Sequence, residues 1–166
     1  PLVALATLNS ALLGRSDSAL CSVVAFALSS AAAQPARLAV AGHLPPLLVD
    51  GEAVTEIGEV GPVLGAFHDA SWDLGRAAVG AGQQLVAVTD GVTEAGGAGE
   101  RFGEARLHAE LAGSASPANS VSKLEGALDL FTAGALDDDA AVLAVTPART
   151  RGGAKPKSES AGCLVS

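Results

Sequence analysis

Aromatic residues, cysteines and long apolar runs are all scarce in this chain. Aromatic side chains make up 3% of the 166 residues, so we expect a core built from Ala, Val and Leu. The two cysteines do not indicate a disulfide framework: Cys21 stands in an apolar run, where we expect a small buried hydrophobe, and Cys163 lies near the C-terminus. No apolar run approaches the roughly twenty residues that cross a bilayer, and no signal peptide is recognisable. These absences favour a cytoplasmic protein without stable membrane association.

Positive charge is also in short supply. Ten Lys and Arg residues stand against 18 Asp and Glu residues, which gives a net charge of −8. Such an acidic surface disfavours binding to the nucleic-acid backbone, and it suits a protein that gathers carboxylates around a cation. With 49% apolar and 17% charged residues, the chain has the composition of one globular domain.

The sequence does contain a clear order of strands and helices. Continuous or alternating apolar residues predict strands, and apolar residues at helical spacing predict helices. The expected strands are 20–28, 37–41, 47–49, 54–57, 71–79, 85–89 and 140–145, and the expected helices are 2–13, 102–111 and 117–131. This order favours an α+β fold of antiparallel sheets with helices packed outside.

The two ends differ from the rest of the chain. From Thr146 onward Arg, Lys, Gly, Pro and Ser dominate, so we expect a folded domain over 1–146 and a disordered basic tail over 147–166. The last four residues, beginning at Cys163, have the form of a prenylation box. We interpret this as coincidence. Since the chain starts at Pro1 in what looks like the middle of an element, we expect a piece of a longer polypeptide.

Two acidic features stand at the ends of expected strands. One strand runs into Asp90-Gly91, and three acids, at 137–139, open the last strand. If the two strands are antiparallel neighbours, the end of one lies beside the start of the other, and the carboxylates converge. Converged carboxylates call for Mg²⁺ or Mn²⁺. Taken alone, Asp90-Gly91 favours a hairpin turn, and the three acids fit a solvated turn equally well.

Four segments together resemble the metal-dependent (PPM, type 2C) serine/threonine phosphatases, in the bacterial branch of the stage II sporulation protein E and RsbU phosphatases. Their order and spacing match from residue 2 to about 146. Leu8-Asn9 and Arg101-Phe102-Gly103 also resemble this branch. The four segments are AGHLPPLL at 41–48, GPVLG at 61–65, VTDGVTEA at 88–95 and DDAAVL at 138–143.

The resemblance implies a fold of two antiparallel β-sheets packed face to face, with helices on the outer sides. It also implies hydrolysis of a phosphoserine or phosphothreonine by a water that two Mn²⁺ or Mg²⁺ ions activate, so no side chain is the nucleophile. By motif, Asp90 and Asp138 are the expected metal ligands. Asp137 and Asp139 are weaker candidates, and Asp139 occupies a place where relatives often have Asn.

The remaining polar residues of the motifs receive structural roles. We expect His43 to be a structural residue at a strand end, not a general acid, because the family resemblance does not support acid catalysis there. His68 and His108 have no partner in the sequence and are expected at the surface. Thr93 and Glu94 are expected to order the loop after Asp90.

The resemblance covers about the C-terminal two-thirds of such a phosphatase domain. Family members carry upstream Gly-Asp and Gly-His-Gly segments, with a carboxylate that bridges both metals, and neither segment is present in this chain. Losing these strands is expected to expose apolar sheet edges. The implied substrate is a phosphorylated regulatory protein of the anti-sigma-factor antagonist type, and an upstream sensor domain is common in the branch. The alternative is a catalytically inactive regulatory or binding module, or a truncated gene product.

Overall fold

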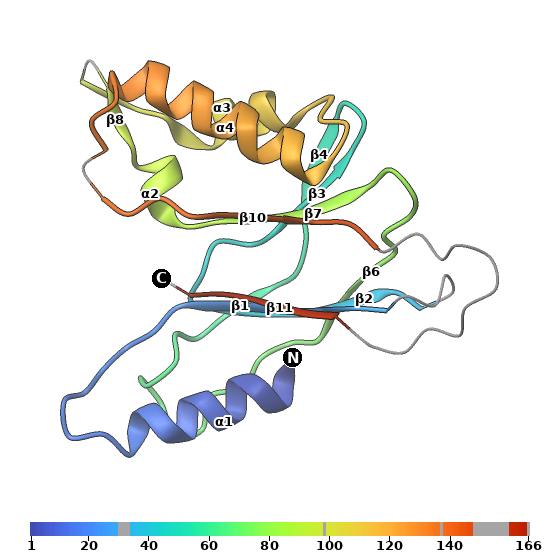
Figure 1. The fold of residues 1–166 in the computed structure, drawn as a ribbon. Helices are drawn as coiled ribbons and strands as arrows, with labels where there is room; N and C mark the ends of the chain where they lie inside the picture. Colours follow the sequence, from blue (N-terminus) through green and yellow to red (C-terminus); the bar gives the residue numbers. More distant parts are fainter. Residues whose placement is uncertain (30–33, 98, 137, 148–159, 166) are drawn as a thin grey trace. The chain divides into compact units, whose positions relative to one another are not determined.

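The chain folds into an α+β arrangement of antiparallel sheets and helices, as its element order predicts (Figure 1). The computed structural model describes residues 1–29, 34–97, 99–136, 138–147 and 160–165. These residues form two compact units. The first contains residues 1–45 and 57–80 with the C-terminal strand, and the second contains 46–56 and 81–146.

The first unit is one sheet covered by one helix. Its strand order is β11-β1-β2-β5, and β6 also pairs with β2. Strands β1 and β2 are antiparallel, as the predicted fold class requires, whereas β5 is parallel to β2. The elements are α1 (Leu2–Leu13), β1 (Val23–Leu28), β2 (Ala36–Ala41), β5 (Val60–Gly61), β6 (Gly75–Ala77) and β11 (Ser160–Val165).

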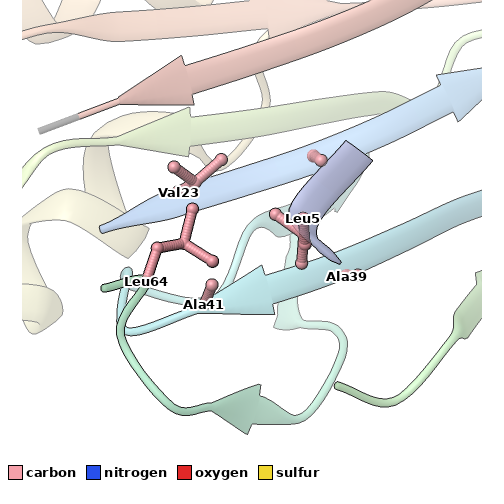
Figure 2. Packing of buried hydrophobic residues seen from close by; sticks show 6 residues of the cluster. Leu5, Val23, Ala39, Ala41 and Leu64 are labelled. Carbon is pink, nitrogen blue, oxygen red and sulfur yellow. The ribbon is translucent and has the colours of Figure 1, made fainter. Parts of the chain in front are cut away.

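Small aliphatic side chains form the core of this unit, as the scarcity of aromatic residues requires. Leu5 of α1 is fully buried in a cluster with strand residues and Leu64 (Figure 2). Cys21 is partly buried against the same cluster, and its burial raises the pKa of the thiol. Asn9, the other buried residue of α1, donates from Nδ2 to the Phe67 carbonyl over 3.0 Å and accepts from the Gly65 amide over 2.8 Å. These bonds hold the 65–67 loop against the helix.

The second unit is a four-stranded antiparallel sheet with helices. Its strand order is β10-β7-β3-β4. The central strand β7 pairs with β3 and β10, and all five of its residues are buried. The elements are β3 (Leu47–Asp50), β4 (Ala53–Glu56), β7 (Gln84–Val88), α2 (Asp90–Thr93), β8 (Gly96–Gly97), β9 (Glu100–Arg101), α3 (Gly103–Leu111), α4 (Pro117–Thr132) and β10 (Val142–Val145).

Helix α4 begins where its sequence predicts. The Ser116 hydroxyl accepts from the Asn119 amide over 3.2 Å, and Pro117 occupies the first helical position, where no backbone donor is needed. The helix packs on α3, with the rings of Phe102 and Phe131 edge to face at 5.5 Å. Arg106 lies over the Phe131 ring, 4.9 Å from its centroid.

The structure corrects several sequence predictions. The disordered tail predicted over 147–166 is wrong for Ser160–Val165, which form β11; residues 148–159 lie outside the described part of the chain. The strand expected over 71–79 shortens to β6, and the short strands β5 and β8 are not among the expected strands. These short strands form because they pair with backbone that is distant in sequence, and the local pattern of apolar residues does not reveal such pairing. None of the described helices has the length and apolar character needed to cross a bilayer.

Candidate functional site

The junction between β7 and β10 brings the two acidic segments together. The two strands are antiparallel with Val88 opposite Val142, so the predicted neighbour relation is confirmed. The pairing continues one residue further, where the Thr89 amide donates to the Ala141 carbonyl over 3.1 Å. The end of β7 that leads to Asp90 therefore lies beside the start of β10.

Thr89 fixes this junction with its side chain as well. Its buried hydroxyl accepts from the Ala141 amide over 2.9 Å and donates to the Asp139 carbonyl over 3.3 Å. A single hydroxyl thus bonds two backbone groups of the acidic segment. The role of Thr89 is not among the sequence predictions; the signal for it in the sequence is a hydroxyl residue at the strand end, directly before the acid.

Gly91 allows the backbones to approach closely. A Cβ atom at this position would lie 2.3 Å from the Asp139 carbonyl oxygen and 2.9 Å from its carbon. Only a residue without a side chain fits between the start of α2 and the acidic segment. The Asp90-Gly91 pair is therefore not a hairpin turn, because Asp90–Thr93 form the short helix α2.

The two predicted ligands, Asp90 and Asp138, are both exposed at this junction. Oδ1 of Asp90 accepts from the Gly91 amide over 3.1 Å, and Oδ1 of Asp138 accepts from the Asp139 amide over 2.8 Å. Each carboxylate is thus oriented by the backbone amide that follows it. Asp139, also exposed, is anchored through its carbonyl by Thr89, while Asp137 lies outside the described residues.

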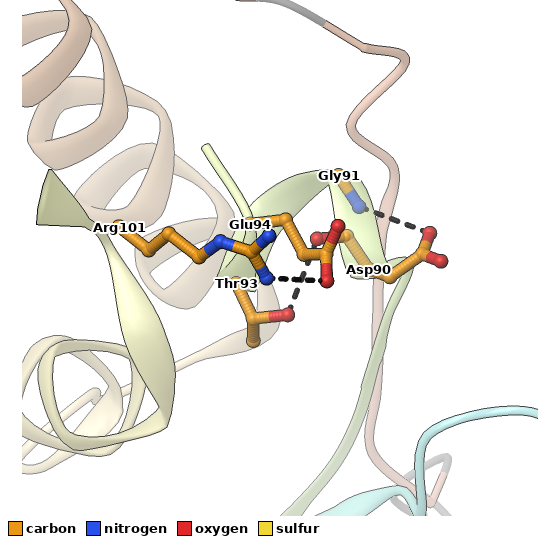
Figure 3. Close-up of polar contacts among 5 residues, drawn as sticks. All are labelled: Asp90, Gly91, Thr93, Glu94 and Arg101. Atoms are coloured by element: carbon orange, nitrogen blue, oxygen red, sulfur yellow. Dashed lines mark hydrogen bonds and ion pairs between the residues drawn. The ribbon is translucent and has the colours of Figure 1, made fainter. Parts of the chain in front are cut away.

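Local bonds order the residues of α2 and the segment that follows it (Figure 3). The Thr93 hydroxyl donates to the Asp90 carbonyl over 3.2 Å, and Glu94 pairs with Arg101 over 2.7 Å. Figure 3 shows the Asp90 carboxylate pointing away from the Glu94–Arg101 pair. These contacts agree with the ordering role predicted for Thr93 and Glu94. Because Arg101 pairs with Glu94, none of the five residues drawn in Figure 3 places a cation beside the Asp90 carboxylate.

The donor set at the junction has the chemistry of a hard-cation site. Exposed carboxylate oxygens are the ligands that Mg²⁺ and Mn²⁺ prefer. Among the described residues, which omit Asp137, no three His, Cys, Asp or Glu side chains gather closely enough to hold a metal ion. Asp90 and Asp138 are therefore suitable ligand types for Mg²⁺ or Mn²⁺, but they form only part of a ligand set.

The histidines divide in a way that the sequence only partly predicts. His68 is exposed, as expected. His43 follows β2 and is 4% exposed, with Nδ1 bonded to the Leu44 carbonyl at 3.0 Å. The surface position predicted for His108 is wrong, because this residue is half-buried. Within the described residues, Nε2 of both His43 and His108 is buried without a hydrogen-bond partner.

Comparisons with known proteins give one family-model match and several solved structures of the same fold. The family model described as stage II sporulation protein E matches residues 1–147. The phosphatase domain of the cell-fate determinant SpoIIE from Bacillus subtilis superposes with a TM-score of 0.65 at 18% identity, covering 94% of this chain and 69% of that one. A manganese-presoaked structure of the same domain gives 0.62 at 17% identity, covering 87% and 64%.

A third solved structure has the same fold. The SiaA-PP2C domain of Pseudomonas aeruginosa gives a TM-score of 0.54 at 22% identity, covering 68% of this chain and 46% of that one. No curated protein sequence matches significantly. At these identities the structural likeness concerns the fold, and the chain spans about two thirds of the two SpoIIE domain chains.

Proposed function

The chain belongs to the stage II sporulation protein E family of PPM phosphatases, and from this membership we propose that it is the C-terminal part, over residues 1–146, of a metal-dependent protein serine/threonine phosphatase. The observation that carries this proposal is the Thr89 junction. It holds Asp90 beside the segment that bears Asp138, and both carboxylates are exposed.

Asp90 and Asp138 are the proposed ligands of Mn²⁺ or Mg²⁺. When bound, these ions activate water as the nucleophile and neutralise charge on the phosphoryl oxygens. The manganese-presoaked structure of the Bacillus subtilis domain supports manganese as the ion to test first. Carboxylates that are already oriented by backbone amides lose little conformational freedom on binding a cation.

Thr89 and Gly91 position the two backbone segments that carry the proposed ligands. Thr89 ties the strand that precedes Asp90 to the backbone between Asp139 and Ala141. Gly91 removes the side chain that would push the two segments apart. Both act on backbone positions and not on the phosphoryl group, so they are positioning residues.

The proposed substrate is a phosphoserine or phosphothreonine on a regulatory protein of the anti-sigma-factor antagonist type, in the cytoplasm. The family resemblance supports this substrate class. The exposure of Asp90 and Asp138 also suits it, because a phosphorylated side chain of a folded protein must reach the carboxylates from outside. An upstream sensor domain would supply the activating signal.

A non-catalytic binding module is the second candidate. The described residues lack a group of three metal-binding side chains, and the family resemblance assigns a bridging carboxylate to a Gly-Asp segment that this chain does not contain. On this account the phosphatase scaffold recognises its partner without hydrolysing the phosphate.

Mn²⁺-dependent hydrolysis of a phosphoserine peptide separates the two candidates. The test uses two chains: the present one, and the same chain extended by an upstream Gly-Asp and Gly-His-Gly segment from a family member. Each is measured with and without the substitution Asp90→Asn. The phosphatase proposal expects activity in the extended chain that Asp90→Asn abolishes. An exposed helical residue, changed as Asp129→Asn, is the matched control. Extended chains that fold and bind Mn²⁺ but do not hydrolyse the peptide would favour the binding module.

A further inference from the structure

One arginine of α3 joins three elements of the second unit. Nη1 of Arg106 donates to the carbonyls of Arg101 and Phe102, over 3.0 and 3.2 Å. Its Nη2 donates to Oε2 of Glu100 over 2.8 Å. The guanidinium also lies over the ring of Phe131, 4.9 Å from the ring centroid. Arg106 thus ties β9 and the start of α3 to helix α4.

The ion pair with Glu100 does not account for this arrangement. The side chains of Arg106 and Glu100 are 47% and 68% exposed, and exposed ion pairs contribute little to stability because water screens them. The guanidinium plane, in contrast, packs on an aromatic ring while its N–H groups donate to two carbonyl oxygens. A lysine ammonium has no plane to stack and offers its donors from one point. The position therefore requires the shape of arginine as well as its charge.

Strand β9 is in turn attached to the segment that follows α2. Arg101 pairs with Gly96 in the β8–β9 ladder, and the Phe102 amide donates to the Ala95 carbonyl over 2.9 Å. Arg101 and Phe102 are the two residues whose carbonyls Arg106 bonds. The arginine therefore fixes the stretch of backbone through which β9 holds this segment.

The same segment reaches Asp90 through the single turn of α2. The Glu94 amide donates to the Asp90 carbonyl over 2.7 Å, and the Thr93 hydroxyl donates to the same oxygen over 3.2 Å. Oε1 of Glu94 also accepts from Arg101 over 2.7 Å (Figure 3). The end of α2 is thus bonded both to Asp90 and to β9, so the place of β9 determines the place of the helix that begins at Asp90.

Helix α4 also holds the strand that precedes Asp90. The Ser120 hydroxyl of α4 donates to Oε1 of Gln84 over 2.8 Å, and both residues are buried. Gln84 is the first residue of β7, the strand that leads to Asp90. The same helix carries Phe131, the ring beneath Arg106. One helix therefore holds Asp90 from both sides, through β7 before it and through Arg106 and β9 after it.

We propose that Arg106 is a positioning residue for Asp90. It fixes β9 on α4, and β9 fixes the end of α2, so the Asp90 carboxylate keeps one place beside the segment that bears Asp138. The consequence for a cation rests on the proposed function, whereas the chain of contacts belongs to the fold of the second unit. Residues that orient a ligand raise metal affinity without touching the metal.

Amide hydrogen exchange in the full chain tests the positioning directly. The two reporter amides are those of Glu94 and Phe102, whose bonds hold the turn of α2 and attach β9 to the segment after it. The reference is the Gly113 amide, which bonds the Gly51 carbonyl elsewhere in the unit. We expect Arg106→Lys to speed exchange at both reporters by at least about fivefold relative to the reference, because the region around α2 opens locally.

Two control variants separate this local effect from general stability. Lys123→Met removes another cation of the unit, whose Nζ donates to the Ala112 carbonyl over 2.8 Å at the other end of α3. It should leave the reporter amides unchanged relative to the reference amide. Glu100→Gln removes the ion pair but keeps the ring contact and both carbonyl bonds of Arg106, so its reporter amides should exchange as in the native chain.

Mn²⁺ titration then connects the contacts to the proposed site. In the folded full chain, we expect Arg106→Lys and Arg106→Met each to lower the Mn²⁺ affinity by about tenfold, while Lys123→Met and Glu100→Gln match the native chain. A general loss of stability would not change the affinity of the chains that remain folded. The titration of the native chain therefore tests the cation site, and the Arg106 variants test the positioning.

The outcomes distinguish the two proposals. If the native chain shows no saturable Mn²⁺ binding, the phosphatase proposal fails, and the exchange rates still decide whether Arg106 holds α2. Equal acceleration of the reporter and reference amides in Arg106→Lys would overturn the positioning role. Native Mn²⁺ affinity in both Arg106 variants, beside a native chain that binds Mn²⁺, would overturn it as well and leave the phosphatase proposal intact.

Discussion

At the scale of single residues, the site rests on Thr89 and Gly91 as much as on the acids. Asp90 and Asp138 are ligand candidates that the sequence alone proposes, because carboxylates at strand ends resemble a known pattern. The role of Thr89 could not be predicted, because its two bonds depend on which backbone groups β10 places opposite it. The contact of Gly91 with Asp139 likewise exists only in the folded register.

Removing the Thr89 hydroxyl should loosen the junction. Thr89→Val keeps the shape of the side chain but leaves the Ala141 amide without its side-chain acceptor and the Asp139 carbonyl without its donor. We expect a loss of about 1–3 kcal/mol in the free energy of unfolding, measured by urea denaturation. Thr89→Ser retains the hydroxyl and is the control. Equal stability of the valine variant and the native chain would show that the hydroxyl does not hold the junction.

Adding one methyl group at Gly91 should also be costly. Gly91→Ala places a Cβ atom 2.3 Å from the Asp139 carbonyl oxygen, so one backbone segment must move. The expected destabilisation is about 1–3 kcal/mol. Gly126 within α4 is the matched control, because a Cβ atom there meets nothing within 4 Å; Gly126→Ala should stabilise by roughly 0.5–1 kcal/mol. If both alanine variants stabilise the chain, the close approach at Gly91 is wrong.

At the scale of elements, a buried polar group attaches helix α4 to the central strand. Gln84 of β7 is 1% exposed; its Nε2 donates to the Ser114 carbonyl and its Oε1 accepts from the Ser120 hydroxyl, each over 2.8 Å. A buried amide with both ends bonded fixes the position of the helix along the strand. The strand that leads to Asp90 is therefore held from its first residue to its last.

Ser120→Ala should weaken this attachment. The substitution leaves the Gln84 amide oxygen buried without its hydroxyl donor, which is expected to cost about 1–3 kcal/mol of unfolding free energy. Ser122 on the same helix is exposed, so Ser122→Ala should change stability by less than about 0.5 kcal/mol. Thermal or urea unfolding of the two variants measures the difference. If the two variants have nearly the same unfolding free energy, the buried bond between Ser120 and Gln84 does not determine the position of the helix.

The elements that could be predicted are those whose own residues specify them. Helix α4 carries its cap, its proline and its apolar stripe in sequence, and α1 carries its leucines at helical spacing. Strand β6, by contrast, was expected to be longer, and β11 was expected to be disordered. Both pair along strands that lie far away in sequence. Pairing partners, and not propensity, define these strands.

At the scale of the whole molecule, the α+β class followed from the order of elements, and the family followed from four short motifs in the right order. The neighbour relation between the end of β7 and the start of β10 could be predicted from sequence, because antiparallel neighbours place one strand's end beside the other's start. The pairing of β11 with β1 could not, since it joins two strands near opposite ends of the chain. We propose that Asp90 and Asp138 share one cation.

Manganese binding to the full chain tests that claim most directly. Titration followed by the electron paramagnetic resonance signal of free Mn²⁺ compares the native chain with Asp90→Asn, Asp138→Asn and the exposed control Asp129→Asn. We predict saturable Mn²⁺ binding, and we expect Asp90→Asn and Asp138→Asn each to lower the affinity by at least about tenfold. The double variant should bind Mn²⁺ no more weakly than the weaker-binding single variant. The control should match the native chain. Equal binding in all four chains, or independent additive losses at Asp90 and Asp138, would contradict a shared site.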